Sequence, residues 1–192
     1  ITFNNTIQNN VTLNKWYSLT MVVNRINNLF QFYVDGALVG TQPISSAFGN
    51  VDLGVPISIG YMSLWNSSYL DGLTDNLHIW NKPLTQQEIQ NYMTCPPSGE
   101  EEGLVGYWNF DEGSGDTVYD LSGNGNHGII HGANYSEDVH DSQKGCTDVK
   151  ALNYDETALC DNGSCVYGDE VVSNLSDSLS TSQQNLTLLE GD

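Results

Sequence analysis

The chain has 192 residues, of which 24 are Asp or Glu and only 5 are Lys or Arg, so its formal net charge at pH 7 is −19. This charge excludes nucleic acid and anionic membrane surfaces as partners, because binding to a phosphate backbone requires a basic face. Only 15% of the residues are charged, against 19 glycines and 10 tyrosines, which is typical of turn-rich β proteins. No apolar run is long enough to predict a membrane-spanning helix.

The first part of the chain carries strand patterns. In residues 18–24, apolar side chains at Leu19, Met21 and Val23 recur with the period of two of a half-buried strand. Residues 30–34 predict a second strand, and Asp35-Gly36 is a type I′ hairpin signal before a third strand. Further strands are predicted within residues 57–61 and 70–80.

A short helix is predicted at residues 85–93. Thr85 is suited to the N-cap position, and Glu88 three residues later completes a capping box. Leu84 and Ile89 stand at the two positions of a hydrophobic staple.

Residues 103–133 form the most informative stretch. An aromatic strand at residues 104–110 leads into an acidic, glycine-rich loop, D-L-S-G-N-G-N-H-G, which is followed by a short strand around Ile129. This stretch resembles the opening of a laminin-G-like, concanavalin A-type jelly roll. Residues 1–93 resemble the middle and end of the same kind of domain, with W-x7-N, VDG and the closing segment N-K-P-L-T-x-x-E-I. The resemblance implies an all-β fold, a two-sheet antiparallel jelly-roll sandwich.

The order of these halves leaves two arrangements open. Either two tandem domains are each incomplete, or residues 1–137 form one permuted sandwich in which residues 94–102 link the two halves. We favour the single sandwich, because a bare half-domain would leave strand edges and apolar faces open. Ten side chains are then expected to be mostly buried: Trp16, Leu19, Met21, Phe32, Val34, Leu77, Ile79, Val105, Tyr107 and Ile129.

A second module is expected at residues 141–167. Cys146, Cys160 and Cys165 lie within twenty residues, in a segment (145–165) that resembles the G-C-T-D-x-x-A-x-N-Y repeat of secreted and surface proteins. So short a segment needs a crosslink or a metal to hold it. The resemblance favours a Cys146–Cys165 disulfide, and Cys160 could pair with Cys95. A zinc site is the alternative, although there is no C-x-x-C motif.

Two sets of oxygen donors are candidate calcium ligands. In related sandwiches a loop like residues 120–126, together with the closing strand, often holds a structural calcium, which here implies Asp75, Asp120, Asn124 and Asn126. The alternative is that Asp120 accepts backbone N–H bonds of its own turn. In the cysteine module the candidates are Asp148, Asn153, Asp155 and Asp161, which lack EF-hand spacing and are as well suited to making turns.

Two aromatic residues are candidate ligand contacts. Trp65 and Tyr69 flank a polar loop, where exposed rings could stack on sugar rings. The alternative is that these rings pack onto the sheet.

The last segment, residues 168–192, has apolar residues at a/d spacing, interrupted by one serine. It predicts the start of a stalk helix, through which the chain could oligomerise, or else a disordered linker.

No nucleophile–base pair or paired acid–base carboxylates are recognisable in a known motif, so no catalytic activity is expected. The sequence has no initiator Met or signal peptide, and we expect it to be an internal piece of a secreted or cell-surface protein. The functional hypothesis is a non-catalytic extracellular adhesion module that recognises glycan or a surface protein. Calcium could be required for this binding. The alternatives are a carbohydrate-binding accessory domain of a larger secreted hydrolase and a structural spacer.

Overall fold

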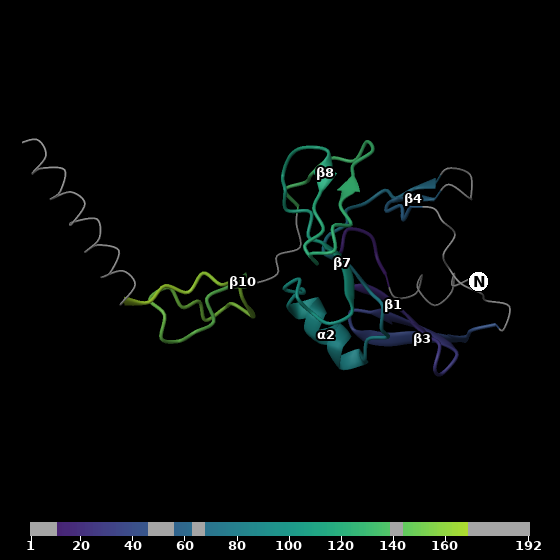
Figure 1. The fold of residues 1–192 in the computed structure, drawn as a ribbon, viewed down its shortest axis with the longest axis horizontal. Helices are drawn as coiled ribbons and strands as arrows, with labels where there is room; N and C mark the ends of the chain where they lie inside the picture. Colours follow the sequence, from purple (N-terminus) through teal and green to yellow (C-terminus); the bar gives the residue numbers. More distant parts are fainter. Residues whose placement is uncertain (1–10, 46–55, 63–67, 139–143, 169–192) are drawn as a thin grey trace, which may run out of the picture. The chain divides into compact units, whose positions relative to one another are not determined.

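The computed structural model describes residues 11–45, 56–62, 68–138 and 144–168. The chain divides into two compact units, residues 1–140 and residues 141–192 (Figure 1). The described residues are mostly β-structure with one short helix. None of the helical structure in these ranges is long and apolar enough to cross a membrane.

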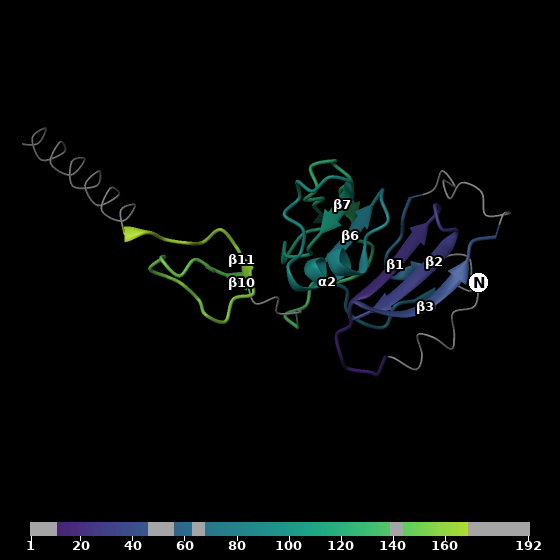
Figure 2. The same ribbon diagram turned by 90° about the horizontal axis from the view of Figure 1, so that it is seen from below.

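A three-stranded antiparallel sheet forms the first part of the larger unit (Figure 2). Strands β1 (Leu19–Asn24), β2 (Leu29–Val34) and β3 (Ala37–Pro43) lie in the order β1-β2-β3. The turn between β2 and β3 has positive φ angles at Asp35 (49°) and Gly36 (68°), as a type I′ turn requires. The hairpin predicted from Asp35-Gly36 is therefore confirmed.

Helix α2 (Gln86–Thr94) begins where its sequence predicts. The Thr85 hydroxyl accepts from the backbone N–H of Glu88, and the Glu88 carboxylate accepts from the backbone N–H of Thr85, so the capping box is confirmed. Leu84 and Ile89 are both buried. The side-chain amides of Gln86 and Gln90 donate to the Gly36 carbonyl over 3.1 and 3.3 Å, and these bonds hold the helix against the β2–β3 turn.

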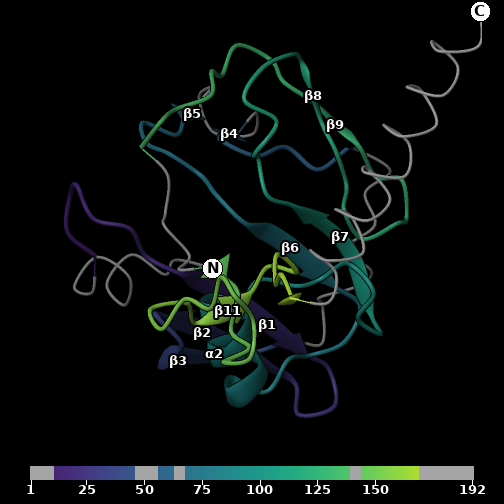
Figure 3. The same cartoon turned by 90° about the vertical axis from the view of Figure 1, so that its left-hand side faces the viewer.

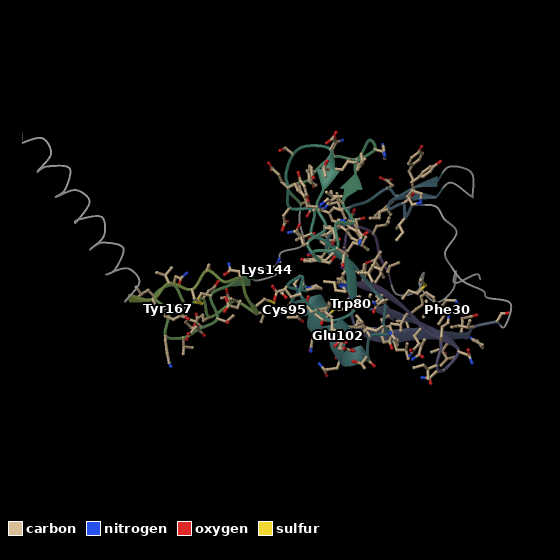
Figure 4. All side chains as sticks on the ribbon, viewed as in Figure 1. Phe30, Trp80, Cys95, Glu102, Lys144 and Tyr167 are labelled. Carbon is tan, nitrogen blue, oxygen red and sulfur yellow. A yellow bond between two sulfur atoms is a disulfide. The ribbon has the colours of Figure 1, made fainter. Side chains whose placement is uncertain are left out.

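The main core lies between this sheet and the helix. Its buried residues are Val22, Tyr33, Leu84 and Ile89, with Trp80 and Tyr92 packed against them (Trp80 is labelled in Figure 4).

The expected burial of Leu19 and Met21 is wrong. These side chains are 62% and 60% exposed. Successive side chains of a strand point to opposite faces, and the face of β1 that meets the core carries Val22. On the other face, the outer strand β1 leaves its side chains open, whereas Val34 on the central strand β2 is buried as expected.

The two halves of the larger unit are joined by a strand pair. β6 (Leu77–Trp80) pairs antiparallel with β7 (Leu104–Trp108), and Figure 3 shows the two side by side. The permuted arrangement requires such pairing between residues 1–93 and residues 104–132. Tyr107 is buried as expected, but Val105 is 36% exposed. It lies where the register shifts, because Ile79 pairs with Gly106 and Trp80 pairs with Leu104, which leaves Val105 in an irregularity of the ladder.

The remaining expected core positions are less enclosed. Trp16, Phe32, Leu77 and Ile79 are half-buried. Ile129, expected to be buried, is 69% exposed. It lies on β9 (Gly128–Ile129), which pairs with β8 (Thr117–Val118), and there it is Val118 that turns inward and packs against Gly128. Strands β4 (Tyr61–Met62) and β5 (Ser68–Tyr69) form a further antiparallel pair. Among the described residues of this unit, the three strand pairs and the three-stranded sheet are separate from one another. The two-sheet jelly roll therefore stays a prediction.

The smaller unit is built around a disulfide. Cys146 and Cys165 are joined, with 4.8 Å between their Cα atoms. Strands β10 (Lys144–Gly145) and β11 (Cys160–Asp161) pair in parallel. Cys95 and Cys160 are disulfide-bonded as well, and no cysteine in the described ranges is free.

Candidate functional site

The candidate site is the hairpin of strands β4 (Tyr61–Met62) and β5 (Ser68–Tyr69), labelled in Figure 3. Tyr61 lies directly opposite Tyr69 in the antiparallel register, and the Leu70 N–H donates to the Gly60 carbonyl over 2.8 Å. Cross-strand neighbours bring their side chains together on one face of a sheet. The two tyrosine rings accordingly lie with their centroids 5.1 Å apart and their planes tilted by 36°.

Both rings of this pair are open to solvent. Tyr69 is 76% exposed and Tyr61 is 40% exposed. The flanking segments add four more exposed aliphatic side chains: Ile57, Ile59, Leu70 and Leu73. Single exposed apolar residues need no explanation, but six of them in one hairpin and the segments that flank it are typical of an interaction surface.

The structure thus places Tyr69 in solvent and not against a sheet. Trp65 lies outside the described residues. Sequence reasoning missed Tyr61, because the sequence does not reveal the strand register across the intervening loop. The alternation of apolar residues in I-S-I-G-Y was the one signal for it.

The second candidate, the loop of residues 120–126, is organised around the Asp120 carboxylate. Asp120 is only 6% exposed. Its Oδ1 accepts from the backbone N–H groups of Tyr107 (3.0 Å) and Ser122 (2.9 Å), and its Oδ2 accepts from that of Asn126 (2.9 Å). Burial acts to raise the pKa of Asp120, but hydrogen bonding by the Ser122 side chain and by these backbone N–H groups outweighs burial and lowers the pKa to about 2.

The asparagines of the same loop fasten it to strand β7. The Asn124 side-chain amide donates to the carbonyls of Leu104 and Val105, both over 3.1 Å. The Asn126 amide donates to the Val105 carbonyl over 2.8 Å. These side chains therefore hold the loop of residues 120–126 against strand β7.

Asp75 lies beside another part of the same strand. Its negative charge acts on the phenol of Tyr107, whose hydroxyl donates to the Asn76 side-chain oxygen over 3.0 Å. Burial, with smaller contributions from Asp111, Asp75 and Glu101, raises the pKa of Tyr107 to about 12. Asp75 and Asp120 thus interact with different groups of Tyr107, the phenol and the backbone amide.

The oxygen donors of the cysteine module also make turns. Asp148, Asp155 and Asp161 each accept over 2.9 Å from the backbone N–H two residues further on, the geometry of Asx turns. Asn153 accepts from the Val166 N–H and donates to the Ser164 carbonyl. Asp148 also accepts from the hydroxyl of Tyr167, which is labelled in Figure 4.

Hydrogen bonding lowers the pKa of both Asp148 and Asp155. In the portion of the chain that the structure describes, no group of three or more His, Cys, Asp and Glu side chains is placed to hold a metal ion. Calcium binding by either set of donors stays a prediction.

An aromatic cluster joins strand β6 to helix α2. The Trp80 indole N–H donates to His78 Nδ1 over 2.8 Å, and the Trp80 ring stacks on Tyr92 with centroids 4.8 Å apart. Burial lowers the pKa of His78, and the charge of Glu101 partly opposes this. The cluster has a structural role that the spacing of these residues in the sequence did not indicate.

Comparisons with known proteins bear on the larger unit. Residues 2–90 match the family model described as the concanavalin A-like lectin/glucanases superfamily. A non-toxic nonhemagglutinin type A of Clostridium botulinum (strain Kyoto / Type A2) is 32% identical over 81 residues. The matching stretch is 42% of this chain but only 6% of that protein.

A solved structure, residues 221–444 of an S-layer domain-containing protein from Clostridium thermocellum ATCC 27405, is 22% identical with a TM-score of 0.36. It covers 42% of this chain and 40% of that one. The resemblance of residues 145–165 to a secreted cysteine repeat stays a prediction. Over residues 2–90, less than half of its length, the chain is similar to laminin-G-like domains of the concanavalin A-like lectin/glucanases superfamily.

Proposed function

We propose that the chain is a non-catalytic carbohydrate-binding module of an extracellular protein and that it binds glycan at the β4–β5 hairpin. The observation that carries this proposal is the exposed, paired rings of Tyr61 and Tyr69. Aromatic rings present an apolar, electron-rich face, which suits the C–H face of a sugar ring. The family includes lectins, which supports glycan over other ligands.

The non-catalytic part of the proposal rests on the chemistry of this surface. Glycoside hydrolysis commonly uses two carboxyl groups that flank the scissile bond. The hairpin instead presents aromatic and aliphatic side chains to solvent. We therefore expect it to hold a glycan without cleaving it, as an adhesion domain or as an accessory domain of a larger secreted hydrolase.

The extracellular location has support from the cysteines. The Cys146–Cys165 disulfide suits an oxidising compartment. The proposed framework for the hairpin is the two-sheet sandwich of the family. Calcium binding, for which Asp120 provides a test, and oligomerisation through residues 168–192 are further proposals. Residues 169–192 lie outside the described ranges.

The direct test is binding of the purified chain to a broad panel of immobilised glycans. We expect at least one glycan to be retained, and Tyr69→Ala to weaken its binding by roughly tenfold, a loss of about 1.4 kcal/mol. Tyr154→Ala is the matched control, because Tyr154 is also exposed (44%) but lies in the smaller unit. The proposal is wrong if no glycan is retained, or if both variants bind as the unmodified chain does. Capture of a protein ligand in place of glycans would favour the surface-protein alternative.

A further inference from the structure

We infer that the β4–β5 hairpin selects electrically neutral glycans and rejects those that carry sialic acid, uronic acid or sulfate. This inference rests on the proposed function, and it names the ligand class of the same site. It follows from the distribution of charge around the two tyrosines.

The hairpin region contains no basic residue. All five Lys and Arg residues, which are Lys15, Arg25, Lys82, Lys144 and Lys150, lie outside residues 56–76. Two of the cations in the larger unit are already engaged. Lys15 lies 4.7 Å from the centre of the Tyr17 ring, and Lys82 forms an ion pair with Glu88 over 3.4 Å.

Negative charge, by contrast, lies close to the tyrosines along the chain. Asp71 is exposed and stands two residues after Tyr69. Asp75 follows in the segment that leads into β6. The whole chain adds to the same effect, since its net charge is −19. An approaching sulfate or carboxylate therefore meets repulsion, which is strongest at low ionic strength.

Proteins hold anionic groups mainly with Arg, Lys or clustered backbone N–H donors. Stacking on a tyrosine ring needs no charge on the ligand. A carboxylate such as that of Asp71 only accepts hydrogen bonds, so it suits sugar hydroxyl groups, which can donate. The exposed chemistry of the hairpin thus matches a neutral pyranose with free hydroxyls.

The geometry also indicates which ring makes the main contact. With centroids 5.1 Å apart and a tilt of 36°, the two rings lie partly face to face, so each leaves its outer face for a ligand. Tyr69 is the more exposed member, at 76% against 40% for Tyr61. We therefore expect a sugar ring to stack chiefly on Tyr69, with Tyr61 alongside it.

The experiment compares two forms of one oligosaccharide, the neutral form and the same chain bearing a terminal sialic acid or sulfate. The neutral form is the best binder from the glycan panel, or lactose-type chains if several bind equally. Dissociation constants are measured for the whole chain in 50 and 300 mM NaCl. We expect the acidic form to bind roughly fivefold or more weakly at 50 mM. The difference should shrink at 300 mM, while binding of the neutral form stays within about twofold.

Variants separate the contributions of charge and stacking. Asp71→Asn removes the charge but keeps a hydrogen-bonding side chain, so it should narrow the gap in affinity between the two glycans by strengthening binding of the acidic one. Tyr69→Ala should weaken binding of both. An acidic glycan that binds as tightly as its neutral form, or more tightly, overturns the selectivity while the proposed function stands. Failure to bind any glycan, neutral or acidic, overturns the proposed function and the selectivity with it.

Discussion

In the loop of residues 120–126 the polar side chains bond to backbone groups of their own unit, whereas in the β4–β5 hairpin the large side chains face solvent. Asp120 accepts three backbone N–H groups and is 6% exposed. Tyr69 is 76% exposed and contacts its cross-strand neighbour. Residue type alone therefore misleads: in this chain the carboxylates and amides build the framework, and the aromatic rings are left for a ligand.

The largest expected effect is the loss of the Asp120 carboxylate. Asp120→Ala leaves the backbone N–H groups of Tyr107, Ser122 and Asn126 without their acceptor, and unsatisfied buried donors are costly. We expect the free energy of unfolding to fall by about 3 kcal/mol, as measured by urea denaturation. A loss below about 1 kcal/mol would mean that the loop does not depend on this carboxylate.

The same variant decides between turn and calcium site. If Asp120 serves only as a turn-former, millimolar calcium leaves the melting temperature of the chain unchanged. Asp120→Ala then lowers the free energy of unfolding by the same amount in calcium as in a chelator. If calcium binds there, it raises the melting temperature by mass action on the folded state, and the variant abolishes that rise. The second result would establish a metal site in this loop, although the backbone hydrogen bonds to Asp120 already satisfy its carboxylate without one.

Low pH should also lower the free energy of unfolding, through protonation of Asp120. The pKa of Asp120 in the folded chain is about 2, below its ordinary value of 3.8, so its ionised form stabilises the fold. This contribution, about 2 kcal/mol, is present above pH 4 and should be lost as the pH falls from about 4 to about 2. Denaturation curves over this range check the loss, which Asp120→Asn should abolish.

His78 should act in a higher pH window. Its Nδ1 accepts from the Trp80 indole, and burial lowers its pKa in the folded chain. Neutral His78 therefore stabilises the fold above its ordinary pKa of about 6.5, and this stability declines as the pH falls below that value. His78→Gln should remove this dependence of the free energy of unfolding on pH below about 6.5. An unchanged pH profile would show that another group titrates there.

A matched pair of glycines measures how tightly α2 holds the first hairpin. Gly36 and Gly113 both have φ of +68°, but a Cβ on Gly36 would lie 2.7 Å from Gln90 Cγ, whereas one on Gly113 would meet nothing within 4 Å. Each substitution by Ala incurs the backbone strain of about 1 kcal/mol. Gly36→Ala should cost roughly 1 kcal/mol more, from the clash with the helix. Equal losses would mean that the helix moves away without penalty.

How far the sequence predicts this molecule depends on the range of each interaction. Helix α2, its capping box and the Asp35-Gly36 turn were predictable, because their signals lie within a few residues. The pairing of β6 with β7 is a contact between the two halves that the single-sandwich prediction requires, and that prediction rested on matching two separated segments to one fold. The exposure of Leu19 and Met21 was not predictable, since it depends on which face of the sheet is covered. The pairing of Tyr61 with Tyr69 depends on a strand register that no local sequence pattern indicates.

Glycan binding at the β4–β5 hairpin is best tested by measuring the free energy of unfolding and the glycan affinity of Tyr69→Ala side by side. The ring is exposed, so we expect the free energy of unfolding to change by less than about 0.5 kcal/mol. Glycan binding should weaken by roughly tenfold, while Tyr154→Ala changes neither quantity. Loss of stability without loss of affinity, or equal affinity in both variants, would contradict the claim that the hairpin is the binding surface.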